Sequence, residues 1–356
     1  MAKKLKAALI GCGTISGAHG DAYRAIADQV ELAYCIDLIR ERAESRKAEF
    51  GTESTICLTD YQEMLADESV DIVSVCLPNH LHAQVSIDCL NAGKHVLCEK
   101  PAAMNYEDAL AMKEAADRNG KILNIGVVNR FNRGVEGVRE AIRAGELGEV
   151  YQVYCSFRAF RSIPALGIWF TTKALAGGGA LIDWGVHFLD LINYCIDAPK
   201  IKTVSAVCHS KLAADMRGYK YRVMHAGPPD YDGTYDVEEF VTGLVRTEGP
   251  TLTFNGAWAQ NIDEEAMFVE FIGTKGGIKL PYGKHYTLYT ERDGEFVAET
   301  PEFEIPNHFR CEIAAFVECV EKGEKIRSNI DEVLVTAKLM DAIYRSAELG
   351  REVTVD

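Results

Sequence analysis

The sequence predicts an α/β protein in which a doubly wound parallel sheet is followed by an α+β domain with a largely antiparallel open sheet. Three observations support this prediction. The chain has 356 residues, more than one ordinary core accommodates. In the first third, short apolar runs alternate with stretches of helical spacing. Beyond about Arg130, the runs become longer and alternate in polarity. We expect domains at 1–128 and 129–356, and we leave open whether the closing helix 331–349 packs back on the first.

The strands expected in the first domain are almost wholly apolar, as in DIVSVCL at 71–77. Such runs are typical of parallel strands covered by helices on both faces. The predicted strands are 5–10, 31–36, 71–77, 95–98 and 122–127. The predicted helices are 38–50, 83–92 and 106–119.

The second domain has strands whose alternation indicates an antiparallel sheet with one face partly solvated. The predicted strands are 150–159, 202–209, 240–246, 251–259, 266–272 and 287–291. The predicted helices are 134–144, 183–195, 309–322 and 331–349. The segment 210–235 is irregular and rich in Gly, Pro, Tyr and charge, and we interpret it as either a functional loop or an oligomer contact.

Composition excludes several classes of protein. The net charge of −15 disfavours nucleic acid as a partner. No run of about eighteen apolar residues predicts a membrane span. The N-terminal apolar run 7–10 leads directly into a glycine turn, so it is interpreted as a strand and not as a signal peptide. Eleven cysteines without a Cys-x-x-Cys pair indicate buried thiols in a reducing cytoplasm.

A glycine-rich turn follows the first predicted strand. Gly11 permits the tight turn, and Gly13 lets the backbone approach a pyrophosphate at the N-terminus of the next helix. Ser16 replaces the third glycine of the usual fingerprint, but a small residue there still allows close packing. A strand before and a helix after the turn are the context of a dinucleotide-binding Rossmann fold. We expect Gly11, Gly13, Thr14 and Ile15 to contact the cofactor.

Asp37 ends the second predicted strand, about twenty residues after this turn, where a carboxylate accepts hydrogen bonds from an adenosine ribose. An ordinary aspartate at a strand end is the alternative. Because a carboxylate repels a 2′-phosphate, NAD is the preferred cofactor. Arg40 and Arg42 follow, and they keep NADP open.

Two segments contain candidate catalytic residues. Lys100 follows a strand of the parallel sheet, at the edge where ligands bind, and could stabilise a developing negative charge on oxygen. Asp183 and His187 are four residues apart and would share a helix face after the triple glycine 177–179. A histidine can take a hydroxyl proton while a carboxylate orients it. Taken alone, the lysine could be merely solvated and the histidine could serve helix packing.

Together these segments resemble the Gfo/Idh/MocA oxidoreductase family over essentially the whole chain. The resemblance is carried by the turn 11–16, PNHLH at 78–82, EKP at 99–101, GGGALIDWGVHFLD at 177–190, Trp258, GTKG at 273–276 and DAIYRSA at 341–347. It implies an NAD-dependent enzyme whose catalytic set is Lys100, Asp183 and His187. In this set His187 is the acid/base, Lys100 polarises the reacting oxygen and Asp183 binds substrate and assists proton transfer.

The resemblance also implies which other residues bind cofactor and substrate. Those expected near the cofactor are Pro78, Asn79, His82, Glu99 and Lys100. Those expected to line the sugar pocket, besides the catalytic pair, are Arg158, Arg161, Trp169 and Phe170. No metal is implied.

The implied reaction is oxidation of a secondary alcohol on a pyranose or cyclitol. The run 157–187 with the 210–235 segment resembles enzymes that oxidise the C3 hydroxyl of glucosides to 3-keto sugars, including those that begin bacterial C-glycoside deglycosylation. Inositol 2-dehydrogenase is the runner-up. A nucleotide-binding or sugar-sensing regulator on the same fold is the alternative of another class, and the presence of Lys100, Asp183 and His187 favours the enzyme. The resemblance further implies a homo-oligomer and a sugar or glycoside substrate.

Overall fold

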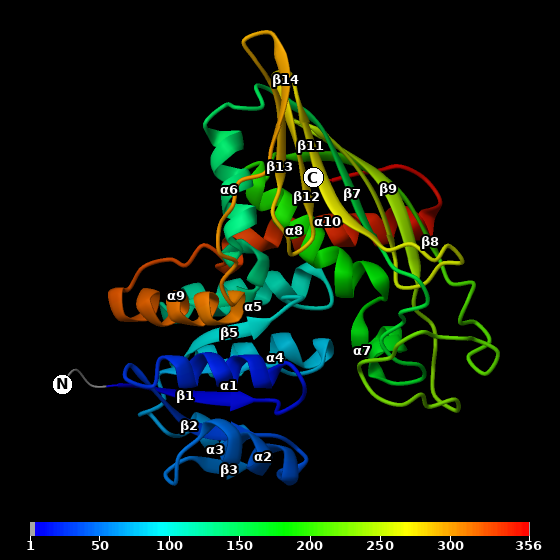
Figure 1. Cartoon of the computed structure of the whole chain (residues 1–356). Helices are drawn as coiled ribbons and strands as arrows, with labels where there is room; N and C mark the ends of the chain where they lie inside the picture. Colours follow the sequence, from blue (N-terminus) through cyan, green and yellow to red (C-terminus); the bar gives the residue numbers. More distant parts are fainter. Residues whose placement is uncertain (1–3, 356) are drawn as a thin grey trace. The chain divides into compact units, whose positions relative to one another are not determined.

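The computed structural model describes residues 4–355, and the chain separates into two compact units (Figure 1). The first unit runs to Phe131 and also contains Asn307–Leu334. The second unit consists of Asn132–Pro306 and the chain from Val335 onward. The division expected from the sequence lies near the first of these boundaries. It differs in that it placed 307–330 in the second domain, whereas it left the packing of 331–349 open.

The first unit is built on a six-stranded sheet in which every neighbouring pair of strands is parallel. The spatial order is β3-β2-β1-β4-β5-β6, so the strand order reverses beside β1. The strands are β1 (Leu5–Ile10), β2 (Val30–Ile36), β3 (Ile56–Leu58), β4 (Ile72–Val75), β5 (His95–Glu99) and β6 (Leu123–Gly126). This order is that of a dinucleotide-binding doubly wound fold, and it confirms the predicted fold class.

Helices connect these strands and form two packed groups. Helix α1 contacts α2 and α9, while α4 contacts α5. The bounds are α1 (Ser16–Ala25), α2 (Arg40–Phe50), α3 (Gln62–Leu65), α4 (Asn79–Asn91), α5 (Tyr106–Asn119), the 3₁₀ helix η1 (Val128–Phe131) and α9 (His308–Lys322). Ile313, Phe316 and Val317 of α9 are buried in the same hydrophobic cluster as Leu9 of β1. Helix α9 therefore completes the core of the first unit from a distant part of the sequence.

The second unit contains a nine-stranded sheet of order β14-β13-β12-β11-β7-β10-β9-β8-β15. Only the β7–β10 pair is parallel, and the other neighbours are antiparallel. The first five strands in sequence are β7 (Val150–Arg158), β8 (Ile201–His209), β9 (Phe240–Thr247), β10 (Thr251–Ala257) and β11 (Ala266–Gly273). The others are β12 (Gly276–Pro281), β13 (Thr287–Arg292), β14 (Glu295–Glu299) and β15 (Val353–Thr354). The largely antiparallel second sheet is thus confirmed.

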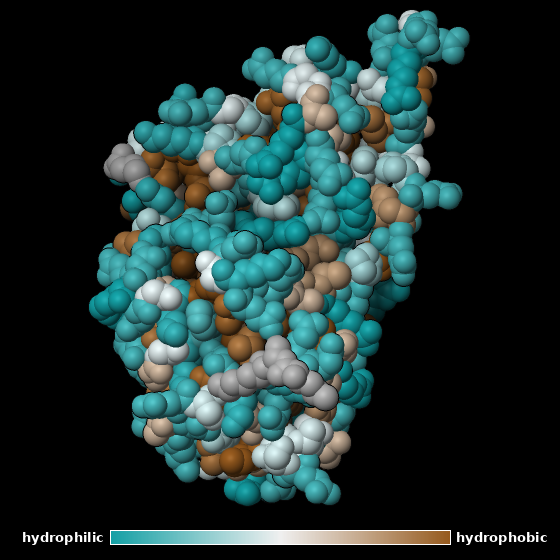
Figure 2. All heavy atoms as spheres, turned by 90° about the vertical axis from the view of Figure 1, so that its left-hand side faces the viewer, coloured by the Kyte–Doolittle hydropathy of each residue, from teal (hydrophilic) through white to brown (hydrophobic). Residues whose placement is uncertain are grey.

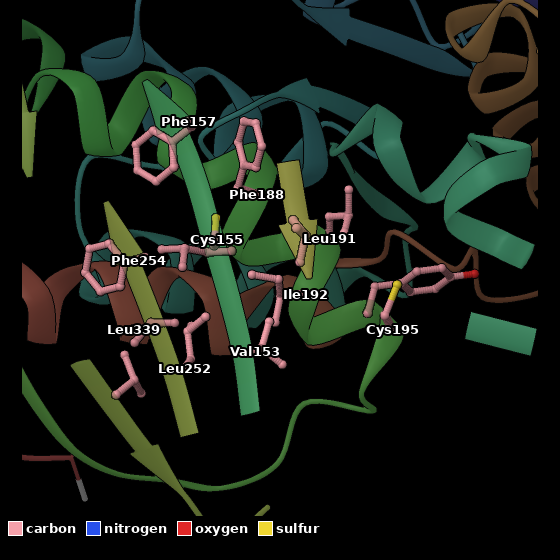
Figure 3. Packing of buried hydrophobic residues seen from close by; sticks show 14 of the residues in the cluster. Val153, Cys155, Phe157, Phe188, Leu191, Ile192, Cys195, Leu252, Phe254 and Leu339 are labelled. Carbon is pink, nitrogen blue, oxygen red and sulfur yellow. The ribbon is translucent and has the colours of Figure 1, made fainter. Parts of the chain in front are cut away.

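The core of the second unit lies between this sheet and its helices (Figure 3). The ring of Phe157 on β7 stacks on Phe188 at a centroid distance of 5.3 Å. Leu252 on β10 and Leu339 belong to the same cluster. The helical elements are α6 (Arg133–Arg143), the 3₁₀ helix η2 (Trp169–Thr171), α7 (Lys173–Ala176), the π-helical turn η3 (Leu181–Gly185), α8 (Val186–Cys195) and α10 (Ile330–Leu349). Helix α10 begins in the first unit and continues into the second.

The segment 210–235 contains no helix or strand, yet it packs on its own unit. Ala213 and Tyr219 are buried in a small hydrophobic cluster together with Ile163, Leu166 and Trp258. The segment is therefore anchored by side-chain packing within the second unit. We call it the insertion.

All eleven cysteines are free thiols, and seven of them are buried. Burial raises the pKa of Cys89 to about 12, and it also raises the pKa of Cys98 and of Cys155. These thiols therefore behave as small apolar side chains, as the sequence indicates.

Figure 2 shows a face on which hydrophilic side chains predominate and apolar ones are scattered.

One helical stretch, Lys173–Cys195, is long and apolar enough to cross a membrane, but 72% of its most apolar window is buried in the protein. Among residues 4–355, no group of three or more His, Cys, Asp or Glu side chains is placed to hold a metal ion.

Candidate active site

The glycine turn leaves β1 at the point where the strand order reverses. Gly11 has a φ of +88°, and a Cβ there would collide with the carbonyl of Cys76. At Gly13, by contrast, a Cβ would meet nothing within 4 Å, so this part of the backbone borders open space. Thr14 is exposed and Ile15 is the N-cap of α1. The turn therefore offers its backbone to a ligand, which is what a dinucleotide pyrophosphate requires.

Asp37 lies directly beside this turn. Its Oδ2 accepts a hydrogen bond from the Cys12 amide at 2.8 Å, and its Oδ1 accepts one from the Ile39 amide at 2.8 Å. The next side chain, Leu38, is 87% exposed although it is apolar. A fixed carboxylate next to an accessible apolar side chain suits the ribose and the base of an adenosine. The turn and this carboxylate together fit NAD.

The sequence did not reveal that Arg46 of α2 supports the turn. Its Nε donates to the hydroxyl of Ser16 at 2.9 Å, and a terminal nitrogen donates to the carbonyl of Gly13 at 3.0 Å. The Ser16 hydroxyl itself donates to the Gly13 carbonyl at 2.6 Å. Ser16 thus does more than allow close packing, because its side chain helps to fix the turn.

The loops after β4 and β5 contain the next predicted residues. Pro78 is the N-cap of α4, and Asn79 is its first residue and only 8% exposed. His82 is buried, with Nδ1 2.7 Å from the carbonyl of Pro101 and Nε2 2.7 Å from that of Leu77. Burial lowers the pKa of His82. His82 therefore connects the two loops, because both of its ring nitrogens contact backbone carbonyls of the protein.

Glu99 is part of a buried polar network that the sequence analysis missed. Its Oε1 lies 2.9 Å from Nε2 of His19 on α1, and its Oε2 accepts from the amide of Lys100 at 3.1 Å. Nδ1 of His19 lies 3.0 Å from the hydroxyl of Ser74, which is 2.7 Å from that of Tyr23. A histidine and a tyrosine four residues apart on one helix, with a serine inside an apolar strand, were the available signal. The network positions Glu99 next to half-buried Lys100.

Asp183 and His187 are both half-buried at the start of the core helix of the second unit. The helix predicted from residue 183 differs in detail, because residues 181–185 form a π-helical turn and α8 begins at Val186. Such turns are rare and often occur at functional sites. The indole N–H of Trp258 donates to Oδ2 of Asp183 over 3.1 Å.

The triple glycine before this turn accommodates the protein's own atoms. A Cβ at Gly178 would collide with the hydroxyl of Tyr344, and one at Gly179 would collide with the carbonyl of Glu238. The Glu238 carboxylate accepts from the amides of Gly179 at 2.9 Å and Leu181 at 3.0 Å, and from the Tyr344 hydroxyl at 3.0 Å. Burial raises the pKa of Glu238. This carboxylate therefore holds the entrance to the helix that bears Asp183.

The predicted substrate residues lie in the run before the triple glycine. Arg158 ends β7, and the rings of Trp169 and Phe170 stack with centroids 3.9 Å apart. Arg161 has a φ of 51°, hydrogen-bonds Asn261 and lies 5.3 Å from the ring centroid of Tyr219 in the insertion. Cation–π contacts of this kind fix the arginine in place.

Backbone hydrogen bonds join the insertion to this run. The amides of Arg222, Ala226 and Asp230 donate to the carbonyls of Arg161, Pro164 and Leu166 at 2.9, 3.0 and 2.8 Å. The insertion thus lies alongside the predicted sugar-binding run over most of that run's length.

Comparison with known proteins identifies the family of the chain. Residues 5–127 match the family described as "Oxidoreductase family, NAD-binding Rossmann fold", and residues 135–279 match the "GFO/IDH/MocA C-terminal domain". The D-glucoside 3-dehydrogenase of Escherichia coli K12 is 32% identical over 353 residues, which are 98% of this chain and 97% of that protein. The chain belongs to the Gfo/Idh/MocA family. It is an NAD-dependent oxidoreductase, as predicted.

Two further relatives of this Gfo/Idh/MocA protein differ in how much of it they match. The inositol 2-dehydrogenase of Salmonella typhimurium is 31% identical, but over only 39% of this chain and 41% of its own. A levoglucosan dehydrogenase solved with NADH and levoglucosan superposes with a TM-score of 0.87 at 22% identity, covering 99% of this chain and all of the other. The second likeness shows the fold alone.

Proposed function

We propose that this protein oxidises a secondary hydroxyl of a glucoside, at C3, to a 3-keto sugar with NAD as the electron acceptor. The observation that carries the proposal is Asp183 in a π-helical turn with His187 at the start of the helix that follows, preceded by a run of arginine and aromatic side chains. Similarity to a protein named D-glucoside 3-dehydrogenase over nearly the whole length supports it, whereas an inositol 2-dehydrogenase matches over less than half.

We assign cofactor binding to the residues that surround the glycine turn and the two loops after β4 and β5. They are Gly11, Gly13, Thr14, Ile15, Asp37, Pro78, Asn79, Glu99 and Lys100, with His82 supporting the two loops from within. The backbone at Gly13 would bind the pyrophosphate, and Asp37 would accept hydrogen bonds from the adenosine ribose. When bound, NAD accepts the hydride that leaves the sugar carbon.

The proposed chemistry assigns one task to each catalytic side chain. The imidazole of His187 takes the proton of the reacting hydroxyl, since histidine exchanges protons near neutral pH. The ammonium of Lys100 stabilises the negative charge that develops on that oxygen. Asp183 binds a sugar hydroxyl and assists the proton transfer. The C–H bond breaks with loss of a hydride, and the carbon–oxygen double bond forms as the O–H bond breaks.

The substrate run suits a sugar ring. The aromatic rings of Trp169 and Phe170 would pack against a sugar face, and Arg158 and Arg161 would donate to its hydroxyls. The insertion lies alongside this run, so we propose that it contacts the aglycone of a glycoside. A free cyclitol would not need such an extension.

The substrate assignment is tested by product analysis. The protein is incubated with NAD and O-glucosides, C-glucosides or myo-inositol in separate reactions, and the new carbonyl is located by ¹³C NMR. We expect a 3-keto glucoside. Faster turnover of myo-inositol, or a carbonyl at another carbon, would contradict the assignment. Cofactor binding without turnover of any alcohol would favour a sensor.

The catalytic assignment is tested with Lys100→Ala and His187→Ala. Each should lower kcat by at least about a hundredfold, the usual scale for a general acid/base or a charge-stabilising donor. NADH binding, followed by fluorescence, should stay within about threefold of the wild type in His187→Ala and should weaken far less than kcat in Lys100→Ala, because neither change removes the turn or the ribose carboxylate. Lys121→Ala, an alteration of another lysine of the first unit, serves as the control. Normal turnover in either variant would remove that residue from the mechanism.

We further propose a cytoplasmic homo-oligomer. Tyr151 of β7, Ile272 of β11 and Tyr289 of β13 are large apolar side chains between 36 and 53% exposed on the nine-stranded sheet, where a second copy could cover them. Eleven unpaired thiols are consistent with a reducing compartment. Light scattering after size-exclusion chromatography measures the number of copies, and a monomer at micromolar concentration would contradict the oligomer.

A further inference from the structure

Trp258 follows β10 directly and is fully buried, which makes it the largest fully buried side chain among the described residues. An indole carries a single N–H donor and no acceptor, so its burial requires a partner for that hydrogen. The partner here is a carboxylate oxygen, Oδ2 of Asp183, at 3.1 Å. Hydrogen bonds to charged groups are stronger than neutral ones, so this contact can hold the carboxylate in one orientation.

The backbone of Trp258 is itself fixed on both sides. Its amide donates to the carbonyl of Glu239 at 2.9 Å, and its carbonyl accepts from the amide of Ser162 at 2.8 Å. These bonds join the Trp258 backbone to Glu239, the neighbour of Glu238, and to Ser162 in the predicted substrate run. The main chain from which the indole projects is therefore held between two neighbouring segments.

Glu239 also closes the insertion. Its carboxylate accepts from the amides of Lys211 and Leu212 at one end of the insertion, the latter at 2.8 Å. At the other end, the hydroxyl of Tyr235 donates to Oε2 of Glu239 at 2.9 Å. Burial raises the pKa of Tyr235, so this phenol remains a donor at neutral pH. The two ends of the insertion thus meet at the residue that binds the Trp258 backbone.

We propose that Trp258 is a positioning residue that orients the Asp183 carboxylate for the reaction, and that the insertion keeps Trp258 in place. The inference rests on the proposed role of Asp183. It assigns the insertion a task in catalysis in addition to its proposed contact with the aglycone. A buried indole that served packing alone would have no effect on the reaction beyond its effect on folding.

Trp258→Phe is the direct test because it keeps a buried aromatic ring and removes the donor. We expect kcat, measured with NAD and the fastest glucoside of the panel above, to fall about ten- to a hundredfold, as for loss of a hydrogen bond to a charged group. NADH affinity should be unchanged. Phe254→Leu, which trims another buried aromatic side chain on β10, is the matched control and should lower the melting temperature while kcat stays within about threefold. Unchanged kcat in a folded Trp258→Phe protein would overturn the inference.

A double-mutant cycle separates positioning from a general structural role. In an Asp183→Ala background, Trp258→Phe should reduce kcat by less than about threefold more, since the group it orients is gone. A further ten- to hundredfold loss in that background would overturn the inference. An impaired Asp183→Ala protein beside a normal Trp258→Phe protein would overturn this inference alone. Normal kcat in Asp183→Ala would overturn both it and the proposed role of Asp183.

A spectroscopic measurement tests the contact without turnover. The chain has three tryptophans, so ¹⁵N-indole labelling yields three side-chain N–H signals. The signal lost in Trp258→Phe should shift upfield in Asp183→Ala, because its acceptor has been removed, and should shift little in Phe254→Leu. A signal that does not respond to Asp183→Ala would contradict the hydrogen bond on which the inference depends.

Discussion

Asp37 accepts hydrogen bonds from two backbone amides, which hold its carboxylate beside the glycine turn. In the proposed function, this negative charge would accept hydrogen bonds from a ribose diol and would repel a 2′-phosphate. We therefore propose that Asp37 determines the preference for NAD over NADP, although Arg40 and Arg42 lie close in sequence.

Replacing Asp37 by Ser should narrow the preference for NAD over NADP. We expect the dissociation constant for NADH to rise about tenfold, because charge-assisted hydrogen bonds to the ribose are lost, while that for NADPH falls. Fluorescence titration measures both constants. Asp28→Ser, which alters an exposed aspartate of the same unit, should change neither. NADPH bound by the wild type as tightly as NADH would refute the assignment.

The His19–Glu99 contact is a second residue-scale feature with a measurable effect. His19→Ala removes a fully buried ring from a buried carboxylate and should lower the free energy of unfolding by about 3 kcal/mol. Tyr23→Phe removes one hydroxyl of the same network and should cost about 1 kcal/mol. Urea denaturation monitored by circular dichroism gives both values. Equal losses in the two variants would mean that the histidine–carboxylate contact has no special weight.

At the scale of elements, the sequence predicted those strands whose burial imposes a pattern. The parallel strands β1, β4 and β5 are covered on both faces and read as apolar runs. Strand β3 was missed because it has only three residues. Strand β12 contains two glycines and a proline, and β14 is largely exposed and charged, so neither carries a periodic apolar signal.

The candidate site was predictable where its residues lie close in sequence. The Asp183–His187 spacing, the glycine turn and the position of Lys100 after a strand are local signals. The Trp258–Asp183 contact spans 75 residues and the Tyr344–Glu238 contact spans 106, and no spacing rule connects them. Such pairings depend on how strands and helices pack, which only the structure shows.

The histidine at the start of β5, beside the beginning of β6, should make the stability of the protein depend on pH. His95 begins β5, its Nδ1 accepts from the Ile122 amide at 3.0 Å, and burial lowers the pKa of His95 to about 4. Well above pH 6.5, the His95 side chain is neutral in both the folded and the unfolded chain. As the pH falls from about 6.5 to 4, the unfolded chain binds a proton that the folded chain does not, so stability decreases.

His95→Asn should flatten that dependence. The amide oxygen can still accept from Ile122, but it does not titrate. We expect the slope of the unfolding free energy between pH 6.5 and 4 to decrease by at most about 1.4 kcal/mol per pH unit, the limit for one proton. The buried His82 remains in both proteins, so the difference isolates His95. Identical slopes would refute this account.

At the scale of the whole molecule, the first unit is discontinuous in sequence. Ile313, Phe316 and Val317 of α9 are fully buried in its core, so a fragment that ends at Phe131 leaves apolar surface uncovered. Such a fragment should bind the dye ANS and unfold at lower urea than one in which 307–334 is joined to it by a flexible Gly/Ser linker. Equal stability of the two fragments would show that α9 contributes little to this core.

The buried thiols can report how often each unit of the protein opens. Cys35, Cys89 and Cys98 lie in the first unit and Cys155 and Cys195 in the second, all without accessible surface. An alkylating reagent reaches these thiols only while the surrounding structure is open. The rate of their labelling therefore measures how often that structure opens. Mass spectrometry of peptides then yields a separate opening frequency for each unit of the unmodified wild-type chain. A cofactor that binds only the first unit would slow alkylation of the cysteines in that unit and leave the alkylation rates in the second unit unchanged.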